Sequence, residues 1–277
     1  MPSASIGDYL KNRVNPVSDK IIRKYISELQ DEFQKKLNIH PWMRFEPFES
    51  EIYQCDFNGT KVSLTQFFWK SNEQRKENII IISGEKHIGK SFFVEKILSN
   101  CIASISEEKK NLIKRNNKGI YRIPILVKQN WFHQYGDKID TIDTLITEVL
   151  ADHYCQNRNE KEWLREDVEK LLSQGRFVVY FQDNEWICTE EKLANILEFG
   201  KVYSNYRGNA KYRNIVLFTS DMKGKIKDSF LNERNSGYIC LKPLQIEEVK
   251  EYLEKQKLTK LLEIAQNHED IMELMVL

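Results

Sequence analysis

The sequence predicts an α/β fold, in which helices pack on a mainly parallel sheet of five strands. Two observations lead to this prediction. Short apolar runs rich in Ile, Val and Phe alternate along the chain with longer helical patterns, which is the arrangement of repeated βαβ units. The runs are apolar throughout rather than alternating, as expected for strands that helices cover on both faces. We therefore expect a three-layer domain over residues 71–242.

Each element of this domain follows from a local pattern. The predicted strands are the continuous apolar runs, at residues 78–83, 121–127, 177–182, 214–219 and 238–241. The predicted helices show helical patterns between these runs, at residues 90–101, 142–154, 161–173 and 190–203.

Helical pieces flank the sheet domain on both sides. Residues 1–70 are expected to form an amino-terminal helical segment, with helices over 18–37 and 63–69. The first of these helices has an apolar face made of Ile22, Ile26, Leu29, Phe33 and Leu37. Residues 243–277 are expected to form a small helical domain. It closes on the apolar run MELMVL without a cap, which favours either a chain that continues or a last helix that docks on the body.

Composition narrows the class of protein. Charged residues make up 30% of the chain and no apolar run approaches the roughly 20 residues that span a bilayer, so we expect a soluble protein. The amino terminus lacks the apolar core of a secretory signal, which predicts a cytoplasmic location. The net charge of +1 offers no general attraction to nucleic acid or to a membrane surface. The 5 cysteines are scattered without metal-ligand spacing and are expected to be reduced structural thiols.

The strongest motif is GEKHIGKS at residues 84–91, which fits G-x-x-x-x-G-K-[ST] between a predicted strand and a predicted helix. In such a P-loop, backbone N–H groups turn inwards around phosphate oxygens and the following helix adds its amino-terminal dipole. We therefore expect a P-loop NTPase fold that binds ATP or ADP. The expected contacts are Gly84, Glu85, Lys86, His87, Ile88, Gly89, Lys90, Ser91 and Phe92.

Two residues of the motif have distinct expected roles. Lys90 would reach the β- and γ-phosphates, and the Ser91 hydroxyl would bind Mg²⁺. The alternative is a glycine-rich turn with an incidental lysine. That alternative is weaker, because a lysine at a tight helix start opposes the helix dipole unless an anion is present.

The segment FVVYFQDNEW supplies an acidic strand end, which a Mg-nucleotide site requires. Asp183 is the candidate for binding Mg²⁺, and Glu185 is the candidate for orienting or deprotonating the attacking water. Both carboxylates could instead only terminate a strand in a solvated loop. Thr219, at the end of the next strand, could hydrogen-bond the γ-phosphate or be an ordinary strand-end threonine. No guanine-reading N-K-x-D motif is present, which favours adenine over guanine.

The chain from about residue 45 to 277 resembles the NACHT-type branch of signal-transducing NTPases within the AAA+-like class. The resemblance rests on the two segments GEKHIGKS and FVVYFQDNEW, together with NIVLFTSD and LKPLQIEEVKEYLEKQ. The resemblance implies a switch: ADP holds a closed monomer, and a trigger sensed by another domain permits ATP exchange and assembly into a ring-like oligomer. Such proteins serve in innate immunity and, in bacteria, in defence against phage.

The chain departs from the family pattern at two places. Trp186 and Ile187 stand where the family usually has Asp and Glu after the acidic strand end, and Asp221 replaces the arginine of Thr-Ser-Arg. Both departures predict slow hydrolysis. Two alternative functions stay open, namely an AAA+-like remodelling ATPase and a nucleotide-stabilised scaffold that never cleaves its nucleotide.

Overall fold

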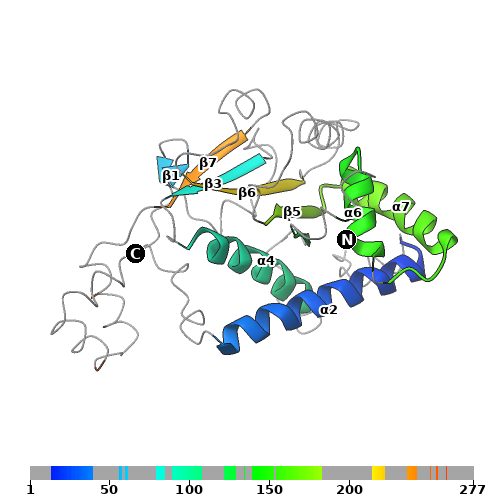
Figure 1. The fold of residues 1–277 in the computed structure, drawn as a ribbon, viewed down its shortest axis with the longest axis horizontal. Coiled ribbons are helices and arrows are strands. Elements are labelled where there is room, and N and C mark those ends of the chain that lie inside the picture. Colours follow the sequence, from blue (N-terminus) through cyan, green and yellow to red (C-terminus); the bar gives the residue numbers. More distant parts are fainter. Residues whose placement is uncertain are drawn as a thin grey trace, which may run out of the picture.

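The computed structural model describes part of the chain. The described residues are 14–39, 56–57, 60–61, 79–84, 89–107, 122–128, 134, 139–152, 154–182, 214–221, 236–241, 250, 254 and 260. Figure 1 shows their arrangement: the strands form one twisted sheet, α4 lies against one face of it, and α2 runs from beside α6 and α7 to beneath α4.

The strands of the parallel part correspond to the apolar runs. They are β3 (Ile79–Gly84), β4 (Ile123–Val127), β5 (Phe177–Phe181), β6 (Ile215–Asp221) and β7 (Ser236–Cys240). Their order across the sheet is β7-β3-β6-β5-β4, and every neighbouring pair in this order is parallel. All residues of β4 and β5 are buried, as expected where both faces are covered. A parallel sheet with helices is therefore present, and the predicted α/β class is confirmed.

Pro124 lies within β4, where proline is normally excluded because it has no N–H to donate. Its place in the sheet explains the exception. β4 is the last of the described strands on its side, and the Leu126 amide, two residues on, donates to the Tyr25 hydroxyl at 2.8 Å rather than to a strand. Because amides two residues apart point the same way, the Pro124 nitrogen also faces this open edge and no ladder hydrogen bond is lost.

Two short strands extend the sheet beyond β7 and were not predicted. β1 (Asp56–Phe57) and β2 (Thr60–Lys61) pair antiparallel, and β1 pairs antiparallel with β7. Strands of two residues are too short to show a periodic pattern. One local signal did exist, because the dipeptide Asn58-Gly59 separates them and is typical of tight hairpin turns.

The helices follow the predicted patterns with shifted ends. They are α2 (Pro16–Ile39), α4 (Lys90–Glu107), α6 (Ile142–Ala151) and α7 (Arg158–Ser173). α7 begins three residues before its predicted start because Asn157 caps it, accepting a 3.0 Å hydrogen bond from the Glu160 amide. Its far end closes on Gly175, at φ 68, whose amide donates to the Leu172 carbonyl.

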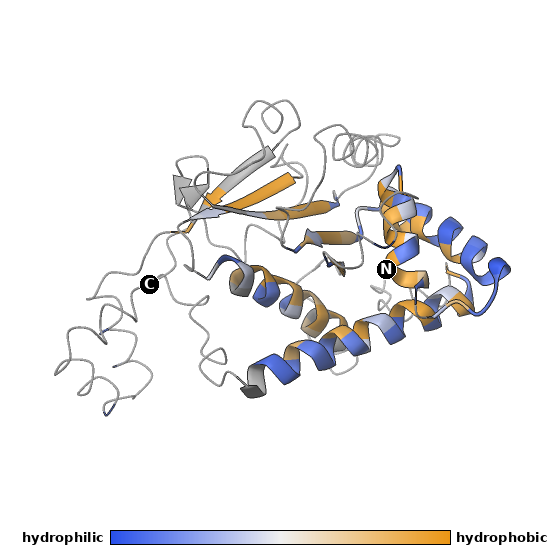
Figure 2. Cartoon of the chain, viewed as in Figure 1, coloured by the Kyte–Doolittle hydropathy of each residue, from blue (hydrophilic) through white to orange (hydrophobic). Residues whose placement is uncertain are grey.

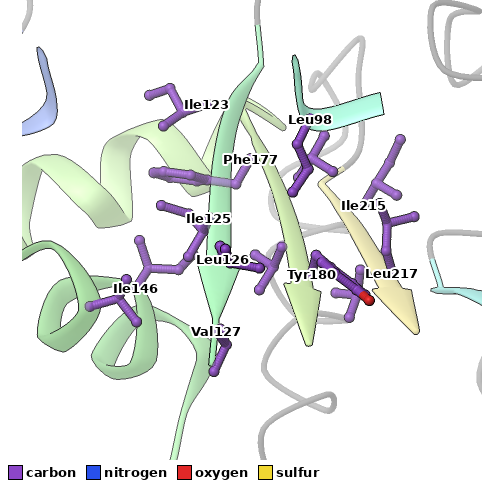
Figure 3. Close-up of a cluster of buried hydrophobic side chains, with 14 of the residues drawn as sticks. Leu98, Ile123, Ile125, Leu126, Val127, Ile146, Phe177, Tyr180, Ile215 and Leu217 are labelled. Carbon is purple, nitrogen blue, oxygen red and sulfur yellow. The ribbon is translucent and has the colours of Figure 1, made fainter. Parts of the chain in front are cut away.

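One apolar core joins the sheet to the helices (Figure 3). Figure 2 shows that the strands of this core are largely apolar, whereas the helices carry polar residues on their outer sides. Phe181 and Phe218 stack with ring centroids 5.1 Å apart between β5 and β6. The buried face of α2, including Ile22 and Phe33, belongs to the same core. α2 is therefore packed as a layer beneath α4.

Several predicted elements lie outside the described residues. These are the helices at 63–69 and 190–203 and most of the small helical domain at 243–277. Within that last range, Lys250, Glu254 and Lys260 are described and are helical.

Candidate functional site

The candidate loop at 84–91 follows β3, which lies inside the parallel part of the sheet between β6 and β7. From β3 the chain passes to β4 at one side, returns through β5 and β6, and then crosses to β7 on the other side of β3. The order of strands therefore reverses next to β3. In open parallel sheets, ligands bind beyond the carboxyl ends of the strands at such a reversal.

Both ends of the loop are described. Gly84 is the last residue of β3, and Lys90 is the first residue of α4, whose ladder begins with a 2.9 Å hydrogen bond from the Phe93 amide to the Gly89 carbonyl. Gly89 has φ +88, a conformation that side chains with a Cβ rarely adopt. A Cβ at this position would meet no heavy atom of the described residues within 4 Å, so the backbone conformation, rather than crowding, favours glycine.

The side chain of Lys90 returns across the loop. Its Nζ donates a 3.1 Å hydrogen bond to the carbonyl oxygen of Gly84, so the ammonium lies where β3 ends. The first turn of α4 contains no acidic residue, and Ser91 is exposed there. The positive end of the helix dipole and the lysine charge are therefore concentrated at one place, which is an arrangement that suits an anion.

β6 lies between β3 and β5, the strand that precedes Asp183 in the sequence. Its register aligns Thr219 with Ile82 and Asp221 with Gly84. Thr219 is 9% exposed, so little of this residue is open to solvent. The backbone of Asp221 is therefore one strand away from the first glycine of the loop.

β5, the strand that precedes Asp183 in the sequence, lies farther from β3 than β6 does. β5 is two strands from β3, which corresponds to about 10 Å between their axes. Beyond its last residue, Phe181, the Gln182 amide donates a 3.0 Å hydrogen bond to the Val127 carbonyl, so the ends of β5 and β4 are joined. Because β5 and β3 are parallel neighbours of β6, Gln182 and Gly84 lie at the same edge of the sheet. Asp183 follows Gln182 in the sequence and lies outside the described residues.

The structure thus describes part of the predicted site. Gly84, Gly89, Lys90, Ser91 and Thr219 are described, together with the backbone of Phe92 in α4. The residues outside the described part are Glu85, Lys86, His87, Ile88, Asp183 and Glu185.

A group of charged residues near the site was missed by sequence reasoning. Glu32, Lys36, Glu95 and Lys128 form ion pairs between α2, α4 and the end of β4. Only the four-residue spacing of Glu32 and Lys36 was visible in the sequence, since the other partners come from distant segments.

Among the residues that the structure describes, no group of three or more His, Cys, Asp or Glu side chains could hold a metal ion. Asp183, an expected Mg²⁺ ligand, lies outside these residues. Likewise, none of the helices in the described part combines the length and apolar character needed to cross a bilayer.

Comparison with known proteins adds no family. No protein-family model matches the chain, and no curated protein matches it significantly. The resemblance to NACHT-type NTPases therefore stays a prediction based on the motifs.

Proposed function

We propose that this protein binds ATP or ADP, with Mg²⁺, at residues 84–91. The observation that carries the proposal is the position of GEKHIGKS between β3 and α4, with the Lys90 ammonium 3.1 Å from the Gly84 carbonyl oxygen. An anion placed there would meet the lysine charge, the amides of the first turn of α4 and the positive end of its dipole. The triphosphate of ATP can interact with all three of these groups.

Each site residue has a proposed role. Lys90 contacts the β- and γ-phosphates, and Gly84 and Gly89 allow the intervening backbone to approach them. Ser91 and Asp183 bind Mg²⁺, which offsets phosphate charge. Thr219 hydrogen-bonds the γ-phosphate, and Glu185 orients the attacking water.

We further propose that nucleotide binding works as a switch within a three-layer P-loop NTPase fold. In this proposal residues 243–277 form a small helical domain that closes over the nucleotide. By resemblance to NACHT-type NTPases, the ADP form is a closed monomer and the ATP form assembles into a homo-oligomer after a trigger acts on another domain. The corresponding biological setting is immune or anti-phage signalling.

One alternative has a specific observation in its favour. A scaffold that holds nucleotide without cleaving it would agree with the register that aligns Asp221 with Gly84, because negative charge near the γ-phosphate opposes the transition state. A remodelling ATPase would instead require steady hydrolysis. Multi-turnover kinetics separates these alternatives.

Calorimetric titration of the purified protein with ATP, ADP and GTP, each with Mg²⁺ and with EDTA, tests the central proposal. Nucleotide that co-purifies is first removed and identified by chromatography. We expect adenine nucleotides to bind more tightly with Mg²⁺ than with EDTA. The proposal is wrong if none of the three nucleotides binds the folded protein.

A further inference from the structure

A chain of alternating charges runs along α2 and joins it to two other elements. Lys128 Nζ lies 2.6 Å from Glu32 Oε2, Lys36 Nζ lies 3.9 Å from Glu32 Oε1, and Lys36 Nζ lies 2.6 Å from Glu95 Oε1. We call these four residues the charge chain. Glu32 and Lys36 are one turn apart on α2. Glu32 pairs with Lys128 after β4, and Lys36 pairs with Glu95 in α4.

The two ends of the charge chain lie on α4 and directly after β4, the strand that neighbours β5. Glu95 is in the second turn of α4, the helix that begins at Lys90. Lys128 directly follows β4, and the Val127 carbonyl accepts the hydrogen bond from the Gln182 amide, one residue before Asp183. The charge chain therefore connects the helix that carries Lys90 to the strand end that leads to Asp183.

α2 is held firmly enough to act as the bridge. Its buried face, including Ile26 and Leu29, packs in the main core, and Figure 1 shows the helix lying beneath α4. The Tyr25 hydroxyl accepts a 2.8 Å hydrogen bond from the Leu126 amide. This bond joins α2 to β4 close to Lys128. The interdigitated apolar side chains set how α2 packs, and the charged pair at 2.6 Å between Lys36 and Glu95 adds a further preference for one relative position.

We infer that Glu32 and Lys36 are positioning residues for the proposed Mg-nucleotide site. They keep the helix start at Lys90 and the strand end before Asp183 at a fixed separation, so that one Mg-nucleotide can contact both. This inference rests on the proposed function. Positioning matters because a misplacement of about 1 Å in a catalytic or binding group has large effects.

The charge chain is partly open to solvent, which limits the size of the expected effect. The side chains of Glu32, Lys36 and Lys128 are 34% to 42% exposed, and that of Glu95 is 14% exposed. Exposed pairs contribute little alone, but several charges in a network contribute more. We expect each neutral variant to weaken Mg-ATP binding about threefold.

The test uses Glu32→Gln and Lys36→Gln in the full chain, with Arg23→Gln as the matched control. Arg23 pairs with Asp19 at 2.7 Å, and both residues lie on α2, so among the described residues this pair stays within one helix. Kd for ATP is measured with Mg²⁺ and with EDTA, and the ratio of the two values is compared. We expect Glu32→Gln and Lys36→Gln to lose part of the Mg²⁺ enhancement, and Arg23→Gln to retain it.

A purely structural role predicts a different result. It would lower the melting temperature of the variants and leave the Mg²⁺ enhancement as in the wild type, which would overturn the inference. Hydrogen exchange of the nucleotide-free protein provides a second measurement. We expect Lys36→Gln to speed exchange in the first turn of α4 and at the Gln182 amide, and unchanged exchange at both places would also overturn the inference.

The calorimetric titration tests the proposed function separately from the inference about Glu32 and Lys36. If the wild type binds no nucleotide in the calorimetric titration, the proposed function is wrong. The exchange measurement then still decides whether the charge chain links α4 to the end of β5.

Discussion

The ammonium of Lys90 donates a 3.1 Å hydrogen bond to the carbonyl oxygen of Gly84, so the side chain at the start of α4 reaches back to the end of β3. A nucleotide that binds there must exchange this bond for contacts with phosphate oxygens. The exchange is favourable because hydrogen bonds between an ammonium and an anion are stronger than those to a neutral carbonyl.

Replacing Lys90 by Ala should abolish stabilisation by Mg-ATP while the protein stays folded. The wild type should gain about 2.7 kcal/mol at 100-fold excess over Kd, by mass action. A thermal-shift series over nucleotide concentration measures this gain. Lys35→Ala, which removes an exposed lysine from α2, is the control and should respond like the wild type. A Lys90→Ala protein that is stabilised as strongly as the wild type would contradict the assigned role.

Gly89→Ala and Gly175→Ala should both destabilise the fold, but only the first should weaken nucleotide binding. Their φ values are 88° and 68°, and a residue with a Cβ at such angles costs about 1–3 kcal/mol. Gly175 lies between α7 and β5, in a turn that closes α7 and is not part of the site. Urea denaturation gives the loss of unfolding free energy, and calorimetry gives Kd. Equal Kd values for the two variants would show that the backbone at Gly89 is not used for binding.

β3, β4 and β5 were predictable because each is a nearly continuous apolar run whose residues are almost all buried. The hairpin at β1 and β2 was not, since its strands have two residues each and only the Asn58-Gly59 dipeptide indicated a turn. Helix ends were less certain than helix positions. The start of α7 depends on the side chain of Asn157, which acts outside the apolar pattern.

The candidate site was predictable where it is local in sequence. The motif gave the places of Gly84 and Lys90 at a strand end and a helix start. The alignment of Asp221 with Gly84 depends on the order of strands, which composition and periodicity do not reveal. The ion pair between Lys36 and Glu95 depends in the same way on how α2 packs against α4.

Tyr25→Phe should destabilise the protein by about 1–3 kcal/mol, because the Leu126 amide at the edge of β4 would lose its acceptor. Burial of the hydroxyl group also raises the pKa of Tyr25 above its usual range. Tyr154→Phe is the control, since its hydroxyl donates to Glu28 at an exposed position. Urea denaturation of both variants measures the difference. Equal losses would mean that the Tyr25 hydroxyl does not stabilise the strand edge.

Cys101 should resist alkylation in the native protein. Burial within α4 raises the pKa of the thiol to about 12, partly opposed by the charge of Arg122. Because the folded pKa is the higher one, the protonated thiol favours the native state below about pH 9, and this contribution is lost as the pH rises towards 12. Peptide mapping after iodoacetamide treatment at pH 8 should show Cys155, which is less buried, reacting first. Rapid labelling of native Cys101 would contradict its burial.

Hydrolysis of ATP should be slower than about one event per second, the low end of ordinary enzyme turnover. Two features support this expectation: Trp186 and Ile187 replace acidic residues after Asp183, and Asp221 is aligned with Gly84, where negative charge opposes the transition state. Single-turnover assays should show faster cleavage by Asp221→Asn and slower cleavage by Glu185→Gln, with exposed Asp31→Asn as the control. Fast cleavage by the wild type would refute the slow switch. An unchanged rate in Glu185→Gln would remove that residue from the mechanism.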